Sequence, residues 1–196
     1  PAAGDPINEE ELSRLTAESR ETLVAYLDLW RRELPGYENA RIEQTGYGLG
    51  VRESRRISGA TTLDAEMVLQ AKKQPDAIGH GIWMVDIHDP KGSGYTTFTD
   101  RGTNNMLRTG ESYHIPYEMC INRAHRNLAV AGRCASSTHE GHSSVRVQTH
   151  CMVMGQGVGT AAAIASKNST DFHDVDYGKL QRVLRDDGVY LEDVPK

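Results

Sequence analysis

Residues 127–163 read NLAVAGRCASSTHEGHSSVRVQTHCMVMGQGVGTAAA and form the most informative segment of the chain. Residues 127–132 are nearly all apolar and end at a glycine, a pattern typical of a buried strand in a parallel sheet. A loop of small polar residues follows, through His142, and the segment ends in a run of small residues that favours a tightly packed helix. A strand, a loop and a helix in this order predict an α/β fold.

The small residues predict a helix that begins at the glycines. Gly155, Gly157 and Gly159 carry no Cβ, so the NH groups of a helix starting there would be open to an anionic or electron-rich group. A phosphate or a cofactor ring carbonyl has this character. Close packing of small residues against a sheet explains the pattern equally well. The spacing is not the GxGxxG of dinucleotide-binding turns.

Apolar periodicity and turn residues predict the elements on either side of this segment. An amphipathic helix is expected over residues 8–34, with Asn8 as its start signal and Pro35-Gly36 as its stop. A shorter helix is expected from a cap at Thr62 or Asp64 to about Lys73. Residues 82–88 and 112–117 are expected as antiparallel strands, with a hairpin or loop over 89–110. Leu180, Val183 and Leu184 indicate a last small helix that stops at Gly188.

Three segments follow from these elements, within one compact unit. Residues 1–40 carry the N-terminal helix, residues 41–121 carry the antiparallel sheet, and residues 122–196 carry the strand, loop and helices of the α/β part. No internal repeat and no low-complexity linker separates them.

The composition excludes several classes of protein. The chain has 196 residues, of which 38% are hydrophobic, enough for one sizeable core. Its net charge of −5 gives no strong attraction to nucleic acid. No apolar stretch reaches the roughly 18 to 20 residues of a membrane span, and no targeting peptide is visible, so a soluble, cytoplasmic protein is expected. Three cysteines without CxxC spacing argue against a disulfide framework.

Three arginines follow the glycine-spaced segment at residues 46–51. In an extended chain Arg52 and Arg56 share one face and Arg55 points the other way. Two arginines on one face are suited to a carboxylate or a phosphate. A solvated edge strand, with Glu53 as ion-pair partner, is the structural alternative.

Histidines gather in the polar loop. His139 and His142 are three residues apart, and His150, Cys134 and Cys151 follow or precede them in sequence. Such a group resembles a zinc-ligand set in residue type, although its spacing fits no common ligand pattern, and no metal is expected. The histidines are expected to line a cleft as polar or proton-transfer groups.

These segments, taken in order, resemble the C-terminal half of the FAD-dependent oxidoreductases related to the glutathione-reductase and fumarate-reductase flavoproteins. The resemblance spans about residues 35–190. Its most specific parts are the string RESRRI at 52–57 and the segment 127–163. The matching pieces are GVRESRRISG (50–59), DAI (76–78), DIH (86–88), YHIPY (113–117), NLAVAGRC (127–134), THE (138–140), RV (146–147) and GQGVGTAA (155–162).

The resemblance implies the C-terminal part of a doubly wound FAD-binding domain, interleaved with an antiparallel substrate-domain sheet. It implies that the loop after residue 132 passes the ribityl and pyrophosphate groups of FAD, and that the small-residue helix start meets the pyrimidine end of the isoalloxazine, where negative charge develops on reduction. The cofactor-binding residues would then be Gly132, Arg133, Cys134, Gly155, Gln156, Gly157, Val158, Gly159 and Thr160. The candidate catalytic residues would be His139 and His142, as proton-transfer groups, and Arg146 and Arg52, as groups that bind an anion.

One departure from the family pattern concerns the ADP moiety. The glycine-rich strand, turn and helix that bind it are absent from these 196 residues. We therefore expect a separate FAD-binding half or subunit, or self-association, as partner. The expected activity is hydride transfer between a small organic substrate, which the sequence does not identify, and the flavin. The alternatives are a non-catalytic partner-binding module and a metal protein using His139, His142 and a cysteine.

Overall fold

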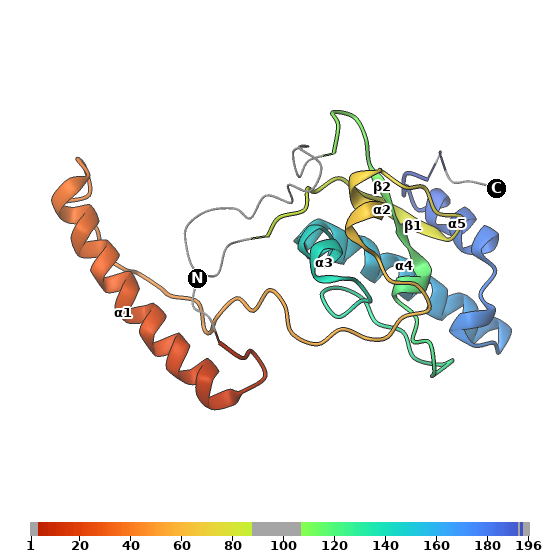
Figure 1. Cartoon of the computed structure of the whole chain (residues 1–196), viewed down its shortest axis with the longest axis horizontal. Coiled ribbons are helices and arrows are strands. Elements are labelled where there is room, and N and C mark those ends of the chain that lie inside the picture. Colours follow the sequence, from red (N-terminus) through yellow and green to blue (C-terminus); the bar gives the residue numbers. More distant parts are fainter. Residues whose placement is uncertain (1–3, 88–106, 192, 194–196) are drawn as a thin grey trace. The chain divides into compact units, whose positions relative to one another are not determined.

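The structure of the chain is a computed structural model that describes residues 4–87, 107–191 and 193 (Figure 1). The described residues form five α-helices and one two-stranded antiparallel sheet, a mixed α/β fold. The chain divides into two compact units between Ser54 and Arg55, the N-terminal unit and the C-terminal unit. This boundary differs from the boundaries at residues 40 and 121 suggested by the sequence.

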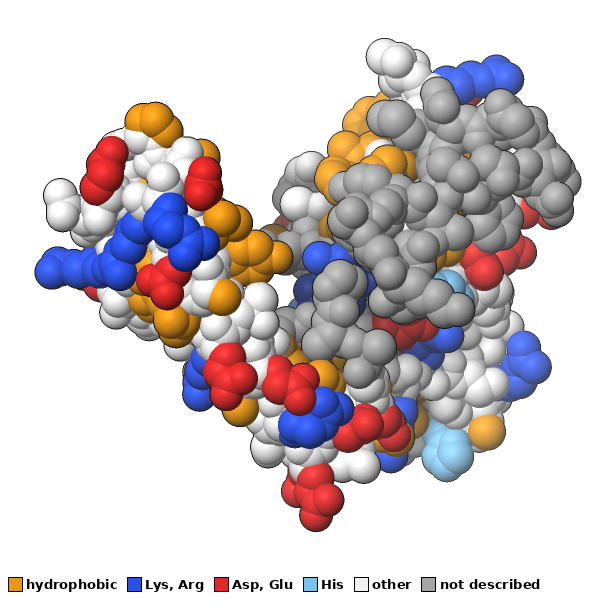
Figure 2. All heavy atoms as spheres, turned by 60° about the vertical axis from the view of Figure 1, so that its left-hand side comes forward, with side chains coloured by type: hydrophobic (Ala, Val, Ile, Leu, Met, Phe, Trp, Pro, Cys, Tyr) orange, Lys and Arg blue, Asp and Glu red, His pale blue; other side chains and the backbone are white. Residues whose placement is uncertain are grey.

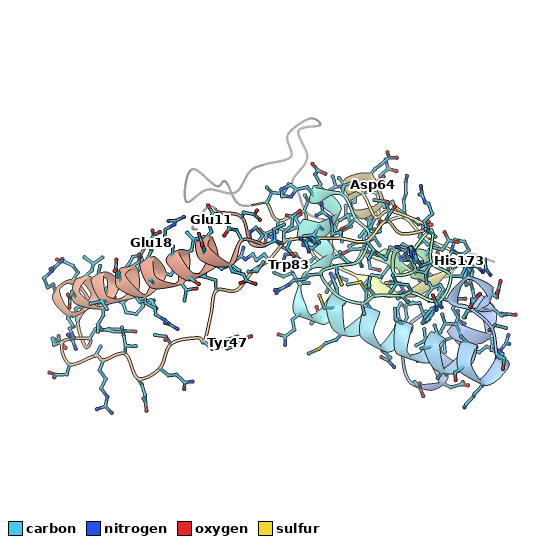
Figure 3. All side chains as sticks on the ribbon, turned by 90° about the horizontal axis from the view of Figure 1, so that it is seen from below. Glu11, Glu18, Tyr47, Asp64, Trp83 and His173 are labelled. Atoms are coloured by element: carbon cyan, nitrogen blue, oxygen red, sulfur yellow. The ribbon has the colours of Figure 1, made fainter. Side chains whose placement is uncertain are left out.

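The N-terminal unit contains the predicted long helix, α1 (Glu9–Glu33). The Asn8 side chain accepts hydrogen bonds from the backbone NH groups of Glu10 and Glu11, at 3.1 and 3.2 Å, as the start signal predicted. The chain leaves the helix at Leu34 and turns at Gly36, whose φ of +91° suits glycine. Glu18, labelled with Glu11 in Figure 3, pairs with Arg14 at 2.6 Å on the polar side.

The apolar stripe of α1 is mostly exposed, and Leu15 is the buried residue of this helix. Figure 2 shows hydrophobic side chains lying among charged ones at the surface of the molecule. Their exposed fractions run from 41% to 53% for the large apolar residues of α1 and its cap, namely Leu23, Val24, Tyr26, Leu29, Trp30 and Leu34. The stripe therefore has the composition of a packing face, but most of it is not buried.

The sheet of the C-terminal unit pairs β1 (Ala77–Gly81) with β2 (Tyr113–Pro116). The predicted strand at 112–117 is confirmed, but its partner lies at 77–81 and not at 82–88. After Gly81 the backbone forms hydrogen bonds with side chains and not with a neighbouring strand. The Ile82 NH donates to His150, and the carbonyl of Trp83, which is labelled in Figure 3, accepts from Ser144. His88 and most of the predicted loop at 89–110 lie outside the described residues.

Two shorter helices begin at acidic caps. Asp64, labelled in Figure 3, caps α2 (Ala65–Leu69) by accepting from the Met67 NH at 2.8 Å. This helix ends four residues before Lys73, because Ala71 takes a positive φ of 51°. Asp176 caps α5 (Tyr177–Asp186), and Gly188 follows it with a φ of +88°, so the predicted last helix is confirmed.

The predicted buried strand at 127–132 is wrong. The structure forms only a single antiparallel bridge there, between Ile121 and Ala129, and Leu128 is exposed. An apolar run of this kind is buried in a parallel sheet, where neighbouring strands pair with it and helices cover its two faces. The described residues contain no such parallel sheet. A doubly wound domain is therefore not formed by the described part of this chain.

The predicted helix start at residues 155–160 is also wrong. These residues lie in the middle of α4 (Gln148–Asn168), which begins seven residues earlier, after a short helix α3 (His139–Val145). Gly157 faces β1, and a Cβ there would lie 2.7 Å from the Cδ1 atom of Ile78. Close packing against the sheet, the alternative explanation of the small residues, holds for Gly157. Gly155 and Gly159 have open space where a Cβ would lie.

Helices α4 and α5 pack against β1 and against each other, and the main core lies between them and the sheet (Figure 1). The three cysteines are free thiols, as expected. Within the described residues, none of the helices combines the length and the apolar character needed to cross a lipid bilayer. The largest fully buried side chains are Tyr113, Tyr117, Leu63, Ile78, Ile115, Met119, Ile121, Met154, Leu180, Leu184, Leu191 and His114.

The two glycines of α4 predict opposite effects of the same substitution. Gly159→Ala is expected to raise the free energy of unfolding by about 0.5 to 1 kcal/mol, because alanine favours a helix and nothing obstructs its methyl group. Gly157→Ala is expected to lower it by about 1 to 2 kcal/mol, because its methyl group overlaps Ile78. Urea unfolding of the two variants measures both changes, and equal effects would contradict the packing.

Candidate functional site

The N-terminus of α4 differs from those of the other helices. Asn8, Asp64, Thr138 and Asp176 cap α1, α2, α3 and α5 with side-chain oxygens. The N-cap residue of α4 is Val147, which has no side-chain acceptor, and its first turn contains no acidic residue. The first NH groups and the positive end of the helix dipole therefore remain suited to an anionic or electron-rich ligand.

Two arginines lie beside this helix start. Arg146 directly precedes Val147, and its Nη2 atom donates to the Asp86 carbonyl at 2.8 Å. The Nε atom of the exposed Arg133 lies 3.4 Å from the Arg146 carbonyl oxygen. Guanidinium groups add fixed positive charge next to the helix dipole, and they bind carboxylates and phosphates well.

The loop at 132–134 lies against the first turns of α4. Gly132 has a φ of +88°, and a Cβ there would contact Cys151 at 3.9 Å. The Cys151 thiol lies 3.4 Å from the Arg146 carbonyl, and burial raises its pKa, while nearby Arg133 lowers it less strongly. The structure thus brings together Gly132, Arg133, Cys134 and Arg146, four of the residues selected from the sequence.

A buried hydrogen-bonded network supports the helix start from inside. His150, in the first turn of α4, accepts from the Ile82 NH through Nε2 at 3.2 Å, so its Nδ1–H faces the Ser144 carbonyl at 3.2 Å. The Tyr113 hydroxyl donates to Ser144 Oγ at 2.8 Å, and Ser144 donates to the Trp83 carbonyl at 2.6 Å. Burial lowers the pKa of His150, which keeps the imidazole neutral. This network fixes the orientation of the first turn of α4.

The other predicted site residues lie on other elements or further along α4. His139 is exposed at the beginning of α3, whereas His142 is buried on the same helix with 1% of its surface exposed. Arg52 lies in the N-terminal unit. The residues from Gly155 to Thr160 lie beyond the second turn of α4, where their NH groups belong to the helix and cannot bind a ligand.

Sequence reasoning missed the network around His150 and a second cluster formed by His80, His114 and Asp193. Val147 is the sequence signal that could have pointed to the network around His150, since a helix that starts without a capping side chain is unusual. The second had none in the local sequence, because its members come together only through strand pairing and the path of the C-terminal segment.

The described residues form a mixed α/β protein in which the start of α4 has no capping side chain and lies beside Arg133 and Arg146. Residues 3–184 match the family model described as FAD dependent oxidoreductase. The chain therefore belongs to the FAD dependent oxidoreductase family, a flavoprotein family with FAD as cofactor. Searches of curated proteins and of solved structures gave no match.

Proposed function

We propose that this chain is the C-terminal portion of a flavin enzyme that transfers a hydride between a small organic substrate and FAD. The flavin supplies the hydride chemistry, and the protein supplies position and charge. The family match over residues 3–184 supports an oxidoreductase. The proposal further assigns the recognition of the flavin ring to the N-terminus of α4, in place of residues 155–160.

The uncapped start of α4 is the observation that carries this assignment. Its donor set fits the electron-rich edge of a flavin, because it combines free helix NH groups, the guanidinium groups of Arg133 and Arg146, and no carboxylate in the first turn. Gly132, Arg133 and Cys134 would line the same side of the cofactor.

His139 is the better placed of the two candidate proton-transfer groups. It is exposed at the start of α3, where a substrate or water can reach its imidazole. The burial of His142 suits a structural role more than proton exchange with a substrate. Arg146 or, as the alternative, Arg52 is proposed to bind an anionic group of the substrate.

The FAD site also needs groups for the ADP moiety, and we propose that a dinucleotide-binding segment outside these 196 residues provides them. The exposed apolar residues of α1 support an association with such a segment, with a second subunit or with another copy of the chain. A non-catalytic subunit derived from such an enzyme is the alternative, and the absence of flavin reduction in the assembled protein would favour it.

A pair of glutamine substitutions tests the assignment in the FAD-loaded holoprotein. Gln148→Glu places a carboxylate in the first turn of α4, and Gln156→Glu places the same charge two turns further along the same helix; both positions are exposed. The first variant is expected to lower the flavin midpoint potential by on the order of 20 mV, which corresponds to about 1 kcal/mol in a two-electron couple. The second is expected to change it much less.

Spectroelectrochemical titration of both variants separates the outcomes. Gln148→Glu is also expected to stabilise the helix by about 0.3 to 1 kcal/mol, so a lowered potential could not be attributed to a damaged fold. A larger shift of the midpoint potential in Gln156→Glu than in Gln148→Glu would indicate that the flavin lies near residues 155–160. Equal small shifts in the two variants would indicate that α4 is not part of the cofactor site.

A further inference from the structure

Two histidines lie side by side on the sheet of the C-terminal unit. His80 of β1 and His114 of β2 are direct partners in the antiparallel register. Side chains of directly opposed residues point to the same face of a sheet. Their ring centroids are 4.6 Å apart, and His114 is completely buried while His80 is partly buried. Strand pairing therefore brings together two imidazoles that are 34 positions apart in the sequence.

Asp193 completes a set of three metal-ligand types. Its Oδ1 atom lies 3.1 Å from His80 Nε2 and 3.0 Å from His114 Nε2. In tetrahedral coordination with bonds of about 2.0 to 2.1 Å, ligand atoms are separated by roughly 3.3 Å. The observed separations are close to this value. A small shift of each side chain would place an ion at bonding distance from all three.

Hydrogen bonds behind the two rings orient them for this role. His80 Nδ1 lies 2.7 Å from Ser112 Oγ. His114 Nδ1 accepts from the Gln74 NH at 2.9 Å and lies 3.2 Å from the Gln74 carbonyl oxygen, so metal binding would move the His114 proton from Nε2 to Nδ1, where this carbonyl accepts it. Metal-bound histidines usually donate the proton of the second ring nitrogen to such an acceptor, which leaves the lone pair of the first for the ion. Both rings thus turn Nε2 toward Asp193.

The position of Asp193 is fixed from two sides. Two residues before it, Leu191 is fully buried, and its carbonyl accepts from Arg185 Nη2 and Nε at 2.7 and 3.2 Å. Lys73 Nζ binds Oδ2 of Asp193 at 2.5 Å, the oxygen that does not face the histidines. The carboxylate therefore has Oδ2 paired with Lys73, while Oδ1 faces the two imidazoles.

We propose that His80, His114 and Asp193 bind a divalent transition-metal ion of the Zn²⁺ type through the two Nε2 atoms and Oδ1. Two imidazoles and a carboxylate are a ligand set that such ions prefer, and three protein ligands leave a position for water or another ligand. The ion would link the C-terminal segment to the sheet. This site is independent of the flavin proposed at α4.

Zinc binding to the metal-free full chain tests the proposal. Isothermal titration with Zn²⁺ is expected to show one ion per chain, and Zn²⁺ is expected to raise the thermal midpoint. Asp193→Asn and His80→Gln are each expected to weaken binding at least tenfold and to abolish the thermal effect. His125→Gln is the matched control, because His125 is an exposed histidine outside the cluster, and it should bind as the wild type does.

Two further variants distinguish a metal site from an ion-pair network. Ser112→Ala is expected to weaken Zn²⁺ binding about tenfold, because it removes the acceptor behind His80. Lys73→Met is expected to weaken binding less than Asp193→Asn does, because it removes only the ion pair that helps to hold the carboxylate. A wild-type chain that binds no Zn²⁺, or binding that is the same in Asp193→Asn, would overturn the proposal. Asp193 is 39% exposed, so this variant should fold.

Discussion

Gly141→Ala is expected to destabilise the C-terminal unit by about 3 kcal/mol, at the upper end of the usual cost of overpacking. Gly141 lies in α3 and packs directly on the chain that leads into α2. A Cβ at this position would overlap the Leu63 carbonyl oxygen and would lie 2.8 Å from the Leu63 carbonyl carbon. Backbone atoms cannot rotate away as a side chain can, so α3 itself would have to move.

The Leu63 backbone cannot move easily either. Its NH donates to the Ser136 carbonyl at 3.1 Å, and its carbonyl accepts from the Thr138 NH at 2.8 Å, in the bridge that joins the start of α2 to the start of α3. Shifting α3 would strain these bonds. The displacement would also reach Arg146 and the start of α4, which follow α3 directly, so flavin binding is expected to weaken together with stability.

Thermal unfolding measures this effect. A loss of about 3 kcal/mol corresponds to a fall in the melting temperature of roughly 6 to 12 °C for a chain of this size. Gly155→Ala is the control, since a methyl group there meets open space and should not reduce stability. A melting temperature of Gly141→Ala within about 2 °C of the wild type would show that α3 does not pack on Leu63 in this way.

His150→Ala is expected to cost about 3 kcal/mol as well, for a different reason. The substitution leaves a cavity at a fully buried position and removes the acceptor of the Ile82 NH and the donor to the Ser144 carbonyl. Buried polar groups left without partners lose their hydrogen bonds without regaining water. His150→Gln, which offers both an acceptor and a donor, should recover part of the loss, whereas His125→Ala at an exposed site should have little effect.

A pH titration gives this prediction a second signature. Burial lowers the pKa of His150 in the folded chain below the ordinary value of about 6.5. As the pH falls below about 6.5, the unfolded chain binds a proton that the folded chain does not bind, so the free energy of unfolding decreases down to the folded pKa. His150→Gln should lose this component of the acid sensitivity. An unchanged pH profile between pH 5 and about 7 would contradict the buried, neutral state of His150.

The local signals in the sequence predicted the starts of α1 and α2 and the ends of α1 and α5. Asn8 and Gly36 bound α1, Asp64 begins α2, and Gly188 follows α5, as expected. Capping and turn signals act within three or four residues of each other, so they are complete in the linear sequence. The resemblance to FAD-dependent oxidoreductases rested on short strings that are likewise complete in the linear sequence, and the family match confirms the family.

The start of α4 could not be predicted from the local sequence. The glycines at 155, 157 and 159 suggested a helix start, although the helix begins at Gln148 without any capping side chain. What positions that start is the bonding of His150 to the Ile82 NH and the Ser144 carbonyl, across 68 and 6 residues of sequence. The site residues Arg133 and Arg146 could be selected by type, but their proximity depends on this packing.

By itself, the sequence determined the family and the helix starts that carry their own caps. The tertiary structure decided which apolar run becomes a strand: residues 77–81 pair with β2, while 127–132 find no covering strands. It also decided that Gly157 serves packing against Ile78, and that His80, His114 and Asp193 meet. The physical reason is that strand pairing and close contact depend on partners distant in the chain, whose free-energy contribution no local pattern records.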